Sequence, residues 1–381
     1  MLDLTDTSFR FEIHHQSKKS RARVGRIITP HGVIETPNFV AVGTNGTLKS
    51  LPNHTHTDLD LQLMFCNTYH LMVQPGTKLI KEAGGLHRFI NRSQPIITDS
   101  GGFQVFSLAY GQVAKELKGQ GGKKHPSSVI KISEGGVIFR SYLNGDKILL
   151  SPESTVDAQK DLGSDIIIPL DELLPFHVDQ AALLASFDRT HRWELRSLAR
   201  HLENPQQQAM FAVIHGGTDL ELRAKSCQIL SNAAFDGFAI GGSLGRDHTQ
   251  LIETVRGTTP HLPADFPVHL LGIGDLTSMD ACIPFGIDTF DSAYPTKVGR
   301  HGMLLTSEGP LKITRLAYAR DFSPIEEHCP CNTCSHYTRA YLHHLFKAKE
   351  PMSAILATEH NLSFMLRWMS SVRTKILCGE I

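Results

Sequence analysis

Short apolar runs that end in a small or polar residue recur along the first 300 residues of the chain. Buried parallel strands read as continuous apolar runs, whereas half-exposed strands alternate apolar and polar residues. Eight such runs are Phe39–Val42, Leu63–Cys66, Ile96–Thr98, Ile166–Leu170, Phe211–Ile214, Phe238–Ile240, Val268–Leu271 and Ile287–Phe290. Eight parallel strands separated by helices predict an α/β fold, a (β/α)8 TIM barrel. Pro169 fits its run poorly because proline removes a backbone donor.

The segments between the later runs predict helices, since Ala181–Leu202 and Leu220–Ala234 carry apolar residues at helical spacing. The first 35 residues predict hairpins. Residues 109–150 interrupt the barrel pattern with a glycine-rich, basic loop at 115–125 and then short strands around a turn at 144–146. We therefore expect a catalytic barrel with N-terminal hairpins and this insertion over residues 1–300, and a further subdomain plus the last barrel helix over 301–381.

Hydrophobic residues make up 41% of the chain and charged residues 20%, so a sizeable core can be buried. The 38 Lys and Arg balance the 38 Asp and Glu, which neither favours nor excludes a nucleic-acid partner. No apolar run reaches about 18 residues, and the N-terminus lacks the basic and apolar regions of a signal peptide. We therefore expect a cytoplasmic protein without a membrane segment.

Three of the seven cysteines fall within six residues, at Cys329, Cys331 and Cys334. Thiols at this spacing can converge on one tetrahedral metal ion such as zinc, and an odd cysteine count fits a reducing compartment better than a disulfide framework. Spacing alone does not choose the fourth ligand among His328, His336, His343, His344 and His360. Unpaired surface thiols are the alternative, although such thiols are reactive.

Polar and small residues follow the apolar runs, at the barrel end where active sites lie. They are Asp99, Asp171, His215, Gly241-Gly242, Gly272-Ile273-Gly274 and Asp291. Each aspartate taken singly also fits a helix N-cap. Three together favour a carboxylate site that supplies a nucleophile, a general acid or base, or metal ligands.

The turn at Asp99-Ser100-Gly101-Gly102-Phe103-Gln104 is the densest of these segments. Its glycines expose backbone N–H groups and Phe103 offers a face for stacking, although a tight loop with a core Phe is the alternative. The segment Pro295–Gly302 closely follows Asp291 and mixes glycine with basic residues, so it could hold phosphates.

Taken together, these residues resemble the bacterial tRNA-guanine transglycosylases, also called queuine tRNA-ribosyltransferases, from about Phe11 to the C-terminus. The motifs that carry the resemblance are Asn67-Thr68-Tyr69-His70-Leu71, Asp99-Ser100-Gly101-Gly102-Phe103-Gln104, Asp171-Glu172, Gly241-Gly242, Phe290-Asp291 with Pro295-Thr296, and the cysteine cluster with Tyr341-Leu342-His343-His344-Leu345 and Thr358-Glu359-His360-Asn361. The resemblance implies a homodimeric TIM barrel with one structural Zn²⁺ on Cys329, Cys331, Cys334 and His360.

The resemblance also implies a base exchange in tRNA. Guanine at wobble position 34 of tRNAs with GUN anticodons (the Asp, Asn, His and Tyr types) is replaced by a 7-deazaguanine, either queuine or preQ1. Asp291 matches the nucleophile that forms a covalent intermediate with the ribose, and Asp99 matches the general acid/base.

Further roles follow from the same resemblance. Residues that match the base-binding pocket are Ser100, Gly101, Gly102, Phe103, Asp171, His215, Gly241, Gly242, Gly245 and Leu271. Residues that match the tRNA-contacting segments are Gly272, Ile273, Gly274, Asp275, Leu276, Thr277, Ser278, Thr296, Lys297, Val298, Gly299 and Arg300.

The chain departs from the bacterial pattern at three places. Leu173 stands where a cysteine is usual and His215 where a glutamine is usual, which puts the base contact of His215 in doubt. Gly245 stands where bacterial members carry valine and eukaryotic members carry glycine. Because the missing side chain leaves room for the bulky substituent of queuine, we hypothesise that this enzyme accepts queuine.

Three other functions would require different features in the sequence. A non-catalytic tRNA-binding paralogue subunit would have lost the nucleophile or the Asp99 motif, and this chain keeps both. An archaeosine-forming enzyme would carry extra C-terminal RNA-binding domains. A barrel metallohydrolase would need metal ligands in the barrel, and the pair His54 and His56 precedes the second run on its helical side.

Overall fold

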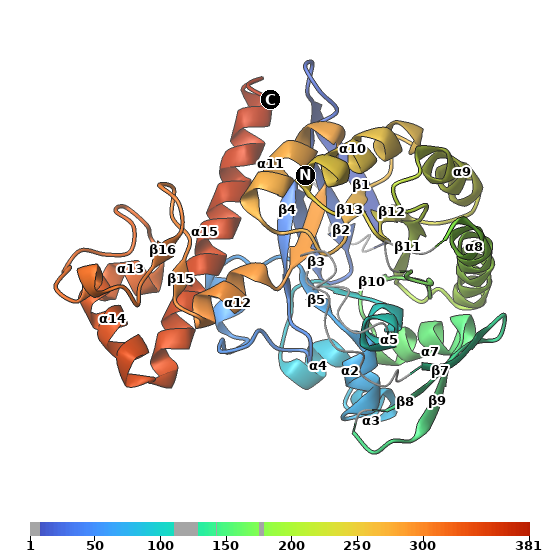
Figure 1. Ribbon diagram of the computed structural model, residues 1–381, viewed down its shortest axis with the longest axis horizontal. Coiled ribbons are helices and arrows are strands. Elements are labelled where there is room, and N and C mark those ends of the chain that lie inside the picture. The colour runs from blue at the N-terminus through green and yellow to red at the C-terminus, as the bar shows by residue number, and fades with distance from the viewer. Residues whose placement is uncertain (1–7, 110–128, 142, 175–178) are drawn as a thin grey trace.

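The computed structural model describes residues 8–109, 129–141, 143–174 and 179–381. Eight parallel strands close into a barrel in the order β10-β11-β12-β13-β14-β4-β5-β6 (Figure 1). They are β4 (Asn38–Val42), β5 (Met64–Cys66), β6 (Ile96–Thr98), β10 (Ile166–Ile167), β11 (Ala209–Ile214), β12 (Gly237–Ile240), β13 (Val268–Leu270) and β14 (Thr289–Ser292). Each predicted run overlaps one of these strands, so the (β/α)8 fold is confirmed.

Two details of the strands differ from the prediction. β10 ends at Ile167, so Pro169 lies beyond the strand and interrupts no ladder. Asp291 lies inside β14 and not in the turn after it, paired in register with Val40 of β4. The apolar run indicated that β14 exists, but its pairing with β13 and β4 determines where β14 ends.

Helices surround the barrel, and several begin at an aspartate whose side chain accepts a free backbone N–H group. Asp179, Asp219, Asp247 and Asp275 cap in this way α8 (Gln180–Leu202), α9 (Leu220–Ser231), α10 (His248–Thr258) and α11 (Leu276–Cys282). The barrel helices are α1 (Thr55–Asp58), α2 (Thr68–Val73), α3 (Thr77–Glu82), α4 (Leu86–Ile90), α5 (Gly102–Ala109), α7 (Pro152–Leu162), α8 (Gln180–Leu202), α9 (Leu220–Ser231), α10 (His248–Thr258), α11 (Leu276–Cys282) and α12 (Tyr294–Arg300), with 3-10 turns η1 (Thr259–His261) and η2 (Ile283–Phe285). The two helices predicted from spacing are α8 and α9, and α9 ends three residues early.

The N-terminal residues form an antiparallel sheet of β1 (Arg10–Gln16), β2 (Arg23–Thr29) and β3 (Gly32–Thr36), as predicted. Its buried Ile27 and Ile34 pack in one cluster with the inward side chains of the barrel strands. Arg23 forms a bidentate ion pair with Asp288, which lies just before β14. Both partners are buried, so this pair fastens the sheet to the barrel.

Aspartates just before three alternate barrel strands fix the start of the neighbouring strand. Oδ2 of Asp165 accepts the N–H of Ile96 at 2.8 Å. Oδ2 of Asp236 accepts from Met210 at 2.8 Å, and Oδ2 of Asp288 accepts from Val268 at 2.7 Å. These carboxylates hold the barrel at its N-terminal end, opposite the strand ends that carry the predicted site.

The insertion contains a second antiparallel sheet of β7 (Val129–Ser133), β8 (Gly136–Arg140) and β9 (Lys147–Leu150). The predicted turn at 144–146 connects β8 to β9, as expected. Val137 and Phe139 pack against Phe106 and Trp193, which places this sheet beside α5 and α8. The predicted loop at 115–125 lies outside the described residues.

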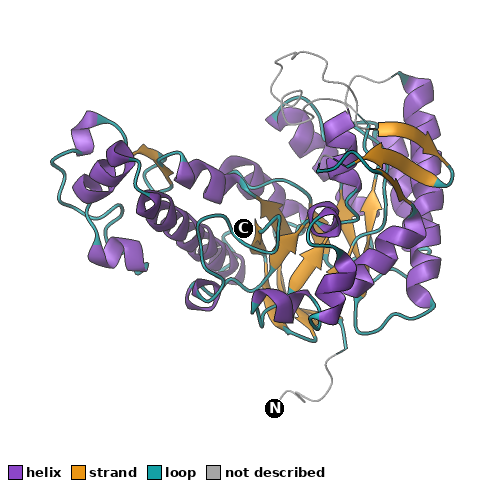
Figure 2. Cartoon of the chain, turned by 90° about the horizontal axis from the view of Figure 1, so that it is seen from below, coloured by secondary structure: helices purple, strands orange, loops and turns teal. Residues whose placement is uncertain are grey.

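The C-terminal region extends to one side of the barrel (Figures 1 and 2). It contains β15 (Met303–Leu304), β16 (Leu311–Lys312), η3 (Leu316–Tyr318), α13 (Asn332–His336) and α14 (Arg339–Ala348). The long α15 (Pro351–Leu377) contacts α13 and α14 of the C-terminal region. It also contacts α12 and β4 of the barrel and β2 of the N-terminal sheet. Within the described residues, no helix combines the length and the apolar character that a membrane span needs.

Candidate active site

The predicted site residues lie along the carboxyl ends of the barrel strands and are linked by a series of close contacts. Gly102 packs closely against Asp171: a Cβ on Gly102 would lie 3.1 Å from the backbone oxygen of Asp171. Asp171 bonds His215, and a Cβ on Gly242 would lie 3.1 Å from the ring of His215. The neighbouring Gly241 packs against Leu271, and Gly272 donates to Asp291. The structure therefore joins these residues into one rim.

Asp99 follows β6 and is held by four donors. Its Oδ2 accepts from the side-chain amides of Asn67 at 2.7 Å and Gln104 at 2.8 Å. Its Oδ1 accepts from the backbone N–H groups of Thr68 and Gly101. Burial nevertheless raises the pKa of Asp99, because desolvation outweighs these hydrogen bonds. A carboxyl group with a raised pKa keeps its proton to a higher pH than a free aspartate does, which suits a general acid.

The turn after Asp99 requires its glycines. Gly101 has φ of +83°, and a Cβ there would lie 3.0 Å from the backbone nitrogen of Tyr69. Ser100 is buried and accepts the N–H of Gly102. Phe103 has 50% of its surface exposed, which leaves the ring available to stack on a flat ligand. The alternative that Phe103 is a core residue is therefore wrong.

Asp171 and His215 form a pair between the loops that follow β10 and β11. Nε2 of His215 donates to Oδ2 of Asp171 at 3.0 Å. The backbone N–H of His215 donates to Ser226, whose hydroxyl also bonds Nε2 of His191. Burial lowers the pKa of His191 to about 4, so this histidine is neutral near pH 7 and accepts the proton of the Ser226 hydroxyl.

The pair lies beside a buried carboxyl group on α8. Oε2 of Glu194 accepts the N–H of Val213 at 2.9 Å. Burial raises the pKa of Glu194 well above its ordinary value, and the nearby charge of Asp171 adds to this shift. Both effects favour the uncharged form of Glu194 beneath Asp171.

Three glycines after β12 allow close packing around the rim. A Cβ on Gly241 would lie 2.5 Å from Val213 and 3.2 Å from Leu271. Gly245 has φ of +117°, and a Cβ there would lie 2.4 Å from the Cβ of Gln250. In this backbone conformation the side chain of a larger residue at position 245 would strike α10.

Asp291 is held through one of its two carboxylate oxygens. Oδ1 accepts from Nε2 of His269 at 2.9 Å and from the backbone N–H of Gly272 at 2.8 Å. Nδ1 of His269 in turn bonds the hydroxyl of Thr289 at 2.8 Å. Among the described residues no hydrogen bond to Oδ2 is found. The carboxylate is thus fixed in orientation while one oxygen stays available for chemistry.

The two segments predicted to contact tRNA differ in what they expose. The first runs from Gly272 to Ser278, and there Gly272 and Thr277 are exposed whereas Ser278 is buried and bonds His248. In the second segment Lys297 is exposed, whereas the side chain of Thr296 is buried. Asp275 caps α11 through the N–H of Ser278, so its carboxylate already has a structural role.

The remaining members of these segments are mostly half-buried. Ile273, Leu276, Val298 and Arg300 are of this kind, while Gly274 and Gly299 are buried. Gly299 lies against α15, where a Cβ would approach the backbone oxygen of Ala357 to 3.0 Å.

The C-terminal region brings Cys329, Cys331, Cys334 and His360 together. Their sulfur atoms lie 3.9, 3.6 and 3.3 Å from Nδ1 of His360, which suits four ligands around one tetrahedral ion. Nε2 of His360 donates to the backbone oxygen of Leu305, so Nδ1 carries the lone pair that a metal needs. The geometry chooses His360 over the other histidines, and the group can hold a metal ion.

A second group of potential ligands, His31, His87 and Asp165, lies at the opposite end of the barrel. The imidazole rings of His31 and His87 are stacked with centroids 3.6 Å apart and planes 11° apart. Both rings contact the carboxylate of Asp165, with Nδ1 of His31 at 2.7 Å and Nε2 of His87 at 3.1 Å. His56, the buried member of the early histidine pair, bonds Arg92.

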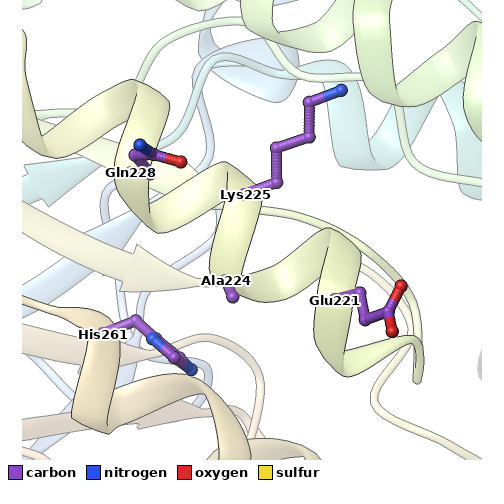
Figure 3. A pocket seen from close by; sticks show the side chains of 5 residues that line it. All are labelled: Glu221, Ala224, Lys225, Gln228 and His261. Atoms are coloured by element: carbon purple, nitrogen blue, oxygen red, sulfur yellow. The ribbon is translucent and has the colours of Figure 1, made fainter.

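A separate hollow lies on the outer surface of α9, lined by Glu221, Ala224, Lys225 and Gln228 with His261 of η1 (Figure 3). None of the predicted site residues lines it. We therefore place the candidate active site at the strand ends.

Comparison with known proteins decides the family. The family model described as queuine tRNA-ribosyltransferase matches residues 17–381. The chain belongs to this family. A relative from Protochlamydia amoebophila strain UWE25 is 61% identical over 370 residues, covering 97% of this chain and 96% of that protein. One from Chlamydia felis strain Fe/C-56 is 58% identical over 375 residues, covering 98% and 100%. Both are named queuine tRNA-ribosyltransferase, so the family is one of transferase enzymes.

Membership of the queuine tRNA-ribosyltransferase family confirms the resemblance inferred from the motifs. Some residues around the site were nevertheless missed. His269 was counted only as part of an apolar run, although a histidine inside such a run is itself a signal. Asn67 and Gln104 were noted in motifs without a role. Arg223 is buried and donates to the backbone of Ile214, Gly217 and Ser243, and nothing in its sequence context indicates this.

Proposed function

We propose that this protein is a tRNA-guanine transglycosylase that exchanges guanine at wobble position 34 of GUN-anticodon tRNAs, those of the Asp, Asn, His and Tyr types, for a free 7-deazaguanine. Family membership supports the reaction class. The observation that carries the mechanism is that Asp291 and Asp99 occupy the same rim, one held through a single oxygen and the other with a raised pKa.

Asp291 is the proposed nucleophile. It attacks C1′ of the ribose from the face opposite the base, and a covalent RNA–enzyme intermediate forms. Asp99 gives a proton to the departing guanine and later takes one from the incoming base. Two inversions at C1′ leave the nucleoside configuration unchanged, as in retaining glycosidases.

The other rim residues bind the base and the RNA. Asp171 accepts N–H groups of the base edge, His215 holds Asp171, and Phe103 and Leu271 flank the flat ring. Glycines 101, 102, 241 and 242 keep the rim closely packed beneath the base. The exposed Lys297 and the segments 272–278 and 296–300 contact the tRNA backbone.

Gly245 bears on the choice of base. The loop from 243 to 246 adopts a conformation with φ of +117° at Gly245 that a valine there would strain. In this backbone a side chain at position 245 would meet Gln250 of α10, so the proposal that the pocket accepts queuine rests on the glycine that this chain shares with the eukaryotic pattern. Competition of the two free bases for labelled guanine in tRNA tests this, and exclusive use of preQ1 would contradict it.

The Cys3His group is proposed to bind one structural Zn²⁺. The donor set and the orientation of His360 fit this ion, which would hold the C-terminal region in shape. We further propose that the protein acts in the cytoplasm as a homodimer, which light scattering of the purified protein would test.

Trapping the intermediate tests the reaction. The protein is mixed with tRNA and a free 7-deazaguanine, and the complex is resolved on a denaturing gel. A shifted band is expected for the wild type and for Asp146→Asn, an exposed carboxylate in the turn before β9, and is expected to vanish for Asp291→Ala. A band that survives Asp291→Ala rules out this nucleophile. Tight tRNA binding with no exchange would instead favour a non-catalytic tRNA-binding paralogue subunit.

A further inference from the structure

His269 is a buried histidine in the middle of β13, directly behind the carboxylate of Asp291. It has no exposed surface, and both of its ring nitrogens are engaged. Such a residue is costly to bury unless its polar atoms are satisfied, and here the partner on one side is the proposed nucleophile.

The contacts direct one donor of this ring at Asp291. A carboxylate oxygen can only accept a hydrogen bond, so Nε2 of His269 carries the proton that faces Oδ1 of Asp291, while Nδ1 lies 2.8 Å from the hydroxyl of Thr289. The contact with Thr289 holds the ring in this orientation. Gly272 supplies the second donor to the same oxygen.

We propose that His269 is a positioning residue that, with Gly272, assigns different tasks to the two oxygens of Asp291. Oδ2 is the attacking atom, and Oδ1 becomes the carbonyl oxygen of the covalent ester. This inference rests on the proposed function. It concerns the rates at which the covalent intermediate forms and breaks down.

In the first half, a lone pair of Oδ2 forms a bond to C1′. The C1′–N9 bond breaks, its electron pair leaves with guanine, and Asp99 gives guanine a proton. In the second half, the incoming base gives a proton to Asp99 and its nitrogen attacks C1′. The C1′–Oδ2 bond then breaks and returns its electron pair to Asp291.

The two donors on Oδ1 affect these halves differently. They stabilise the carboxylate more than the uncharged ester, so they make Asp291 a better leaving group and a weaker nucleophile. Removing one donor should therefore slow breakdown of the intermediate more than its formation. The intermediate should then accumulate.

Two variants test this in single-turnover experiments with tRNA, followed by addition of the base. His269→Leu removes the donor, and Thr289→Val removes the hydroxyl that holds the ring in its orientation. For both we expect breakdown to slow about tenfold, formation and the KM for tRNA to change less than about threefold, and the trapped fraction to rise. Thr289→Ser should recover most of the lost breakdown rate. Thr258→Val, which removes a buried hydroxyl from α10, is the control.

The possible results separate this inference from the proposed function. A wild type that forms no adduct overturns the covalent step and this inference with it. A normal wild-type adduct with unchanged breakdown in Thr289→Val, or with a larger effect on formation, overturns the inference alone. Should His269→Leu not fold, Thr289→Val decides. A crystal structure of the trapped adduct must also place the ester carbonyl, and not the bridging oxygen, against Nε2 of His269.

Discussion

Nε2 of His215 lies 3.0 Å from Oδ2 of Asp171, although the two residues are 44 positions apart and follow different barrel strands. The histidine occupies a position where the bacterial relatives were expected to carry glutamine. A glutamine amide could also donate to Asp171, so the pair keeps the same task with a different donor. His215 therefore supports the carboxylate that we propose to bind the base.

Changing Asp171 should weaken binding of the base far more than changing His215. Asp171→Asn replaces one charged acceptor by a donor, and we expect the KM for the free base to rise by about ten- to a hundredfold. His215→Gln keeps an N–H group facing Asp171, and we expect less than about a fivefold change. Steady-state kinetics with varied base would check both. Equal effects would mean that His215 contacts the base directly.

An alanine should destabilise the protein more at Gly245 than at Gly309, a glycine with a similar φ whose missing Cβ faces open space. Gly309 has φ of +111° with no atom near its missing Cβ, whereas a Cβ on Gly245 would strike Gln250. Both Gly→Ala changes carry the backbone strain of about 1–2 kcal/mol. We expect Gly245→Ala to lower the free energy of unfolding by about 1–3 kcal/mol more than Gly309→Ala does. Urea denaturation measures the difference, and equal losses would contradict the contact with Gln250.

Removing the proposed zinc should unfold the C-terminal region before the barrel. Without the ion the cysteine thiolates repel one another and His360 loses its ligand bond. Binding of a structural zinc ion contributes about 10 kcal/mol of folding free energy in small sites. Calorimetry after chelation, or of Cys334→Ser, should show an early transition ahead of the main one. Cys378→Ser, which changes the exposed cysteine after α15, should keep the wild-type trace. An unchanged trace after complete chelation would contradict a structural role.

The stability contributed by His31 should depend on pH. Its hydrogen bond to Asp165 raises the pKa of His31 above 6.5, so this contribution is complete below about pH 6.5 and is lost as the pH rises through the raised value. Burial alone would raise the pKa of Asp165, but the hydrogen bonds from His31 and His87 outweigh it and lower that pKa below 3.8. The contribution of Asp165 is therefore lost only as the pH falls through the lowered value.

We expect His31→Ala to lower the free energy of unfolding more at pH 6 than at pH 8.5. Because the His31 side chain is 39% exposed, the extra loss should be only about 1 kcal/mol. Denaturation at both pH values measures it. The control is His14→Ala, an exposed histidine on β1 with a weak contact to Glu12 at 4.0 Å. A loss that is larger at pH 8.5 would show that the raised pKa of His31 is not its source of stability.

Much of the barrel could be predicted because each strand is recognisable from its own short stretch of sequence. A continuous apolar run between polar turns has few alternatives to a buried strand, and Phe211–Ile214 and Phe238–Ile240 illustrate this. The residues directly after the runs were found for the same reason. His269 escaped notice because its role depends on Asp291 and Thr289, which lie 22 and 20 residues away on the next strand.

The sequence by itself determined the eight strands, the carboxylates at their ends, the cysteine cluster and the family. Cysteine spacing left the fourth ligand open, the motif resemblance pointed to His360, and the structure brings His360 to the three cysteines. Only the tertiary structure paired His215 with Asp171 and placed His269 behind a single oxygen of Asp291. Patterns along a chain record the period of a strand or helix and the residue at its end. A hydrogen bond between side chains of different strands depends on register and on angles of a few tens of degrees, which the packed barrel alone sets.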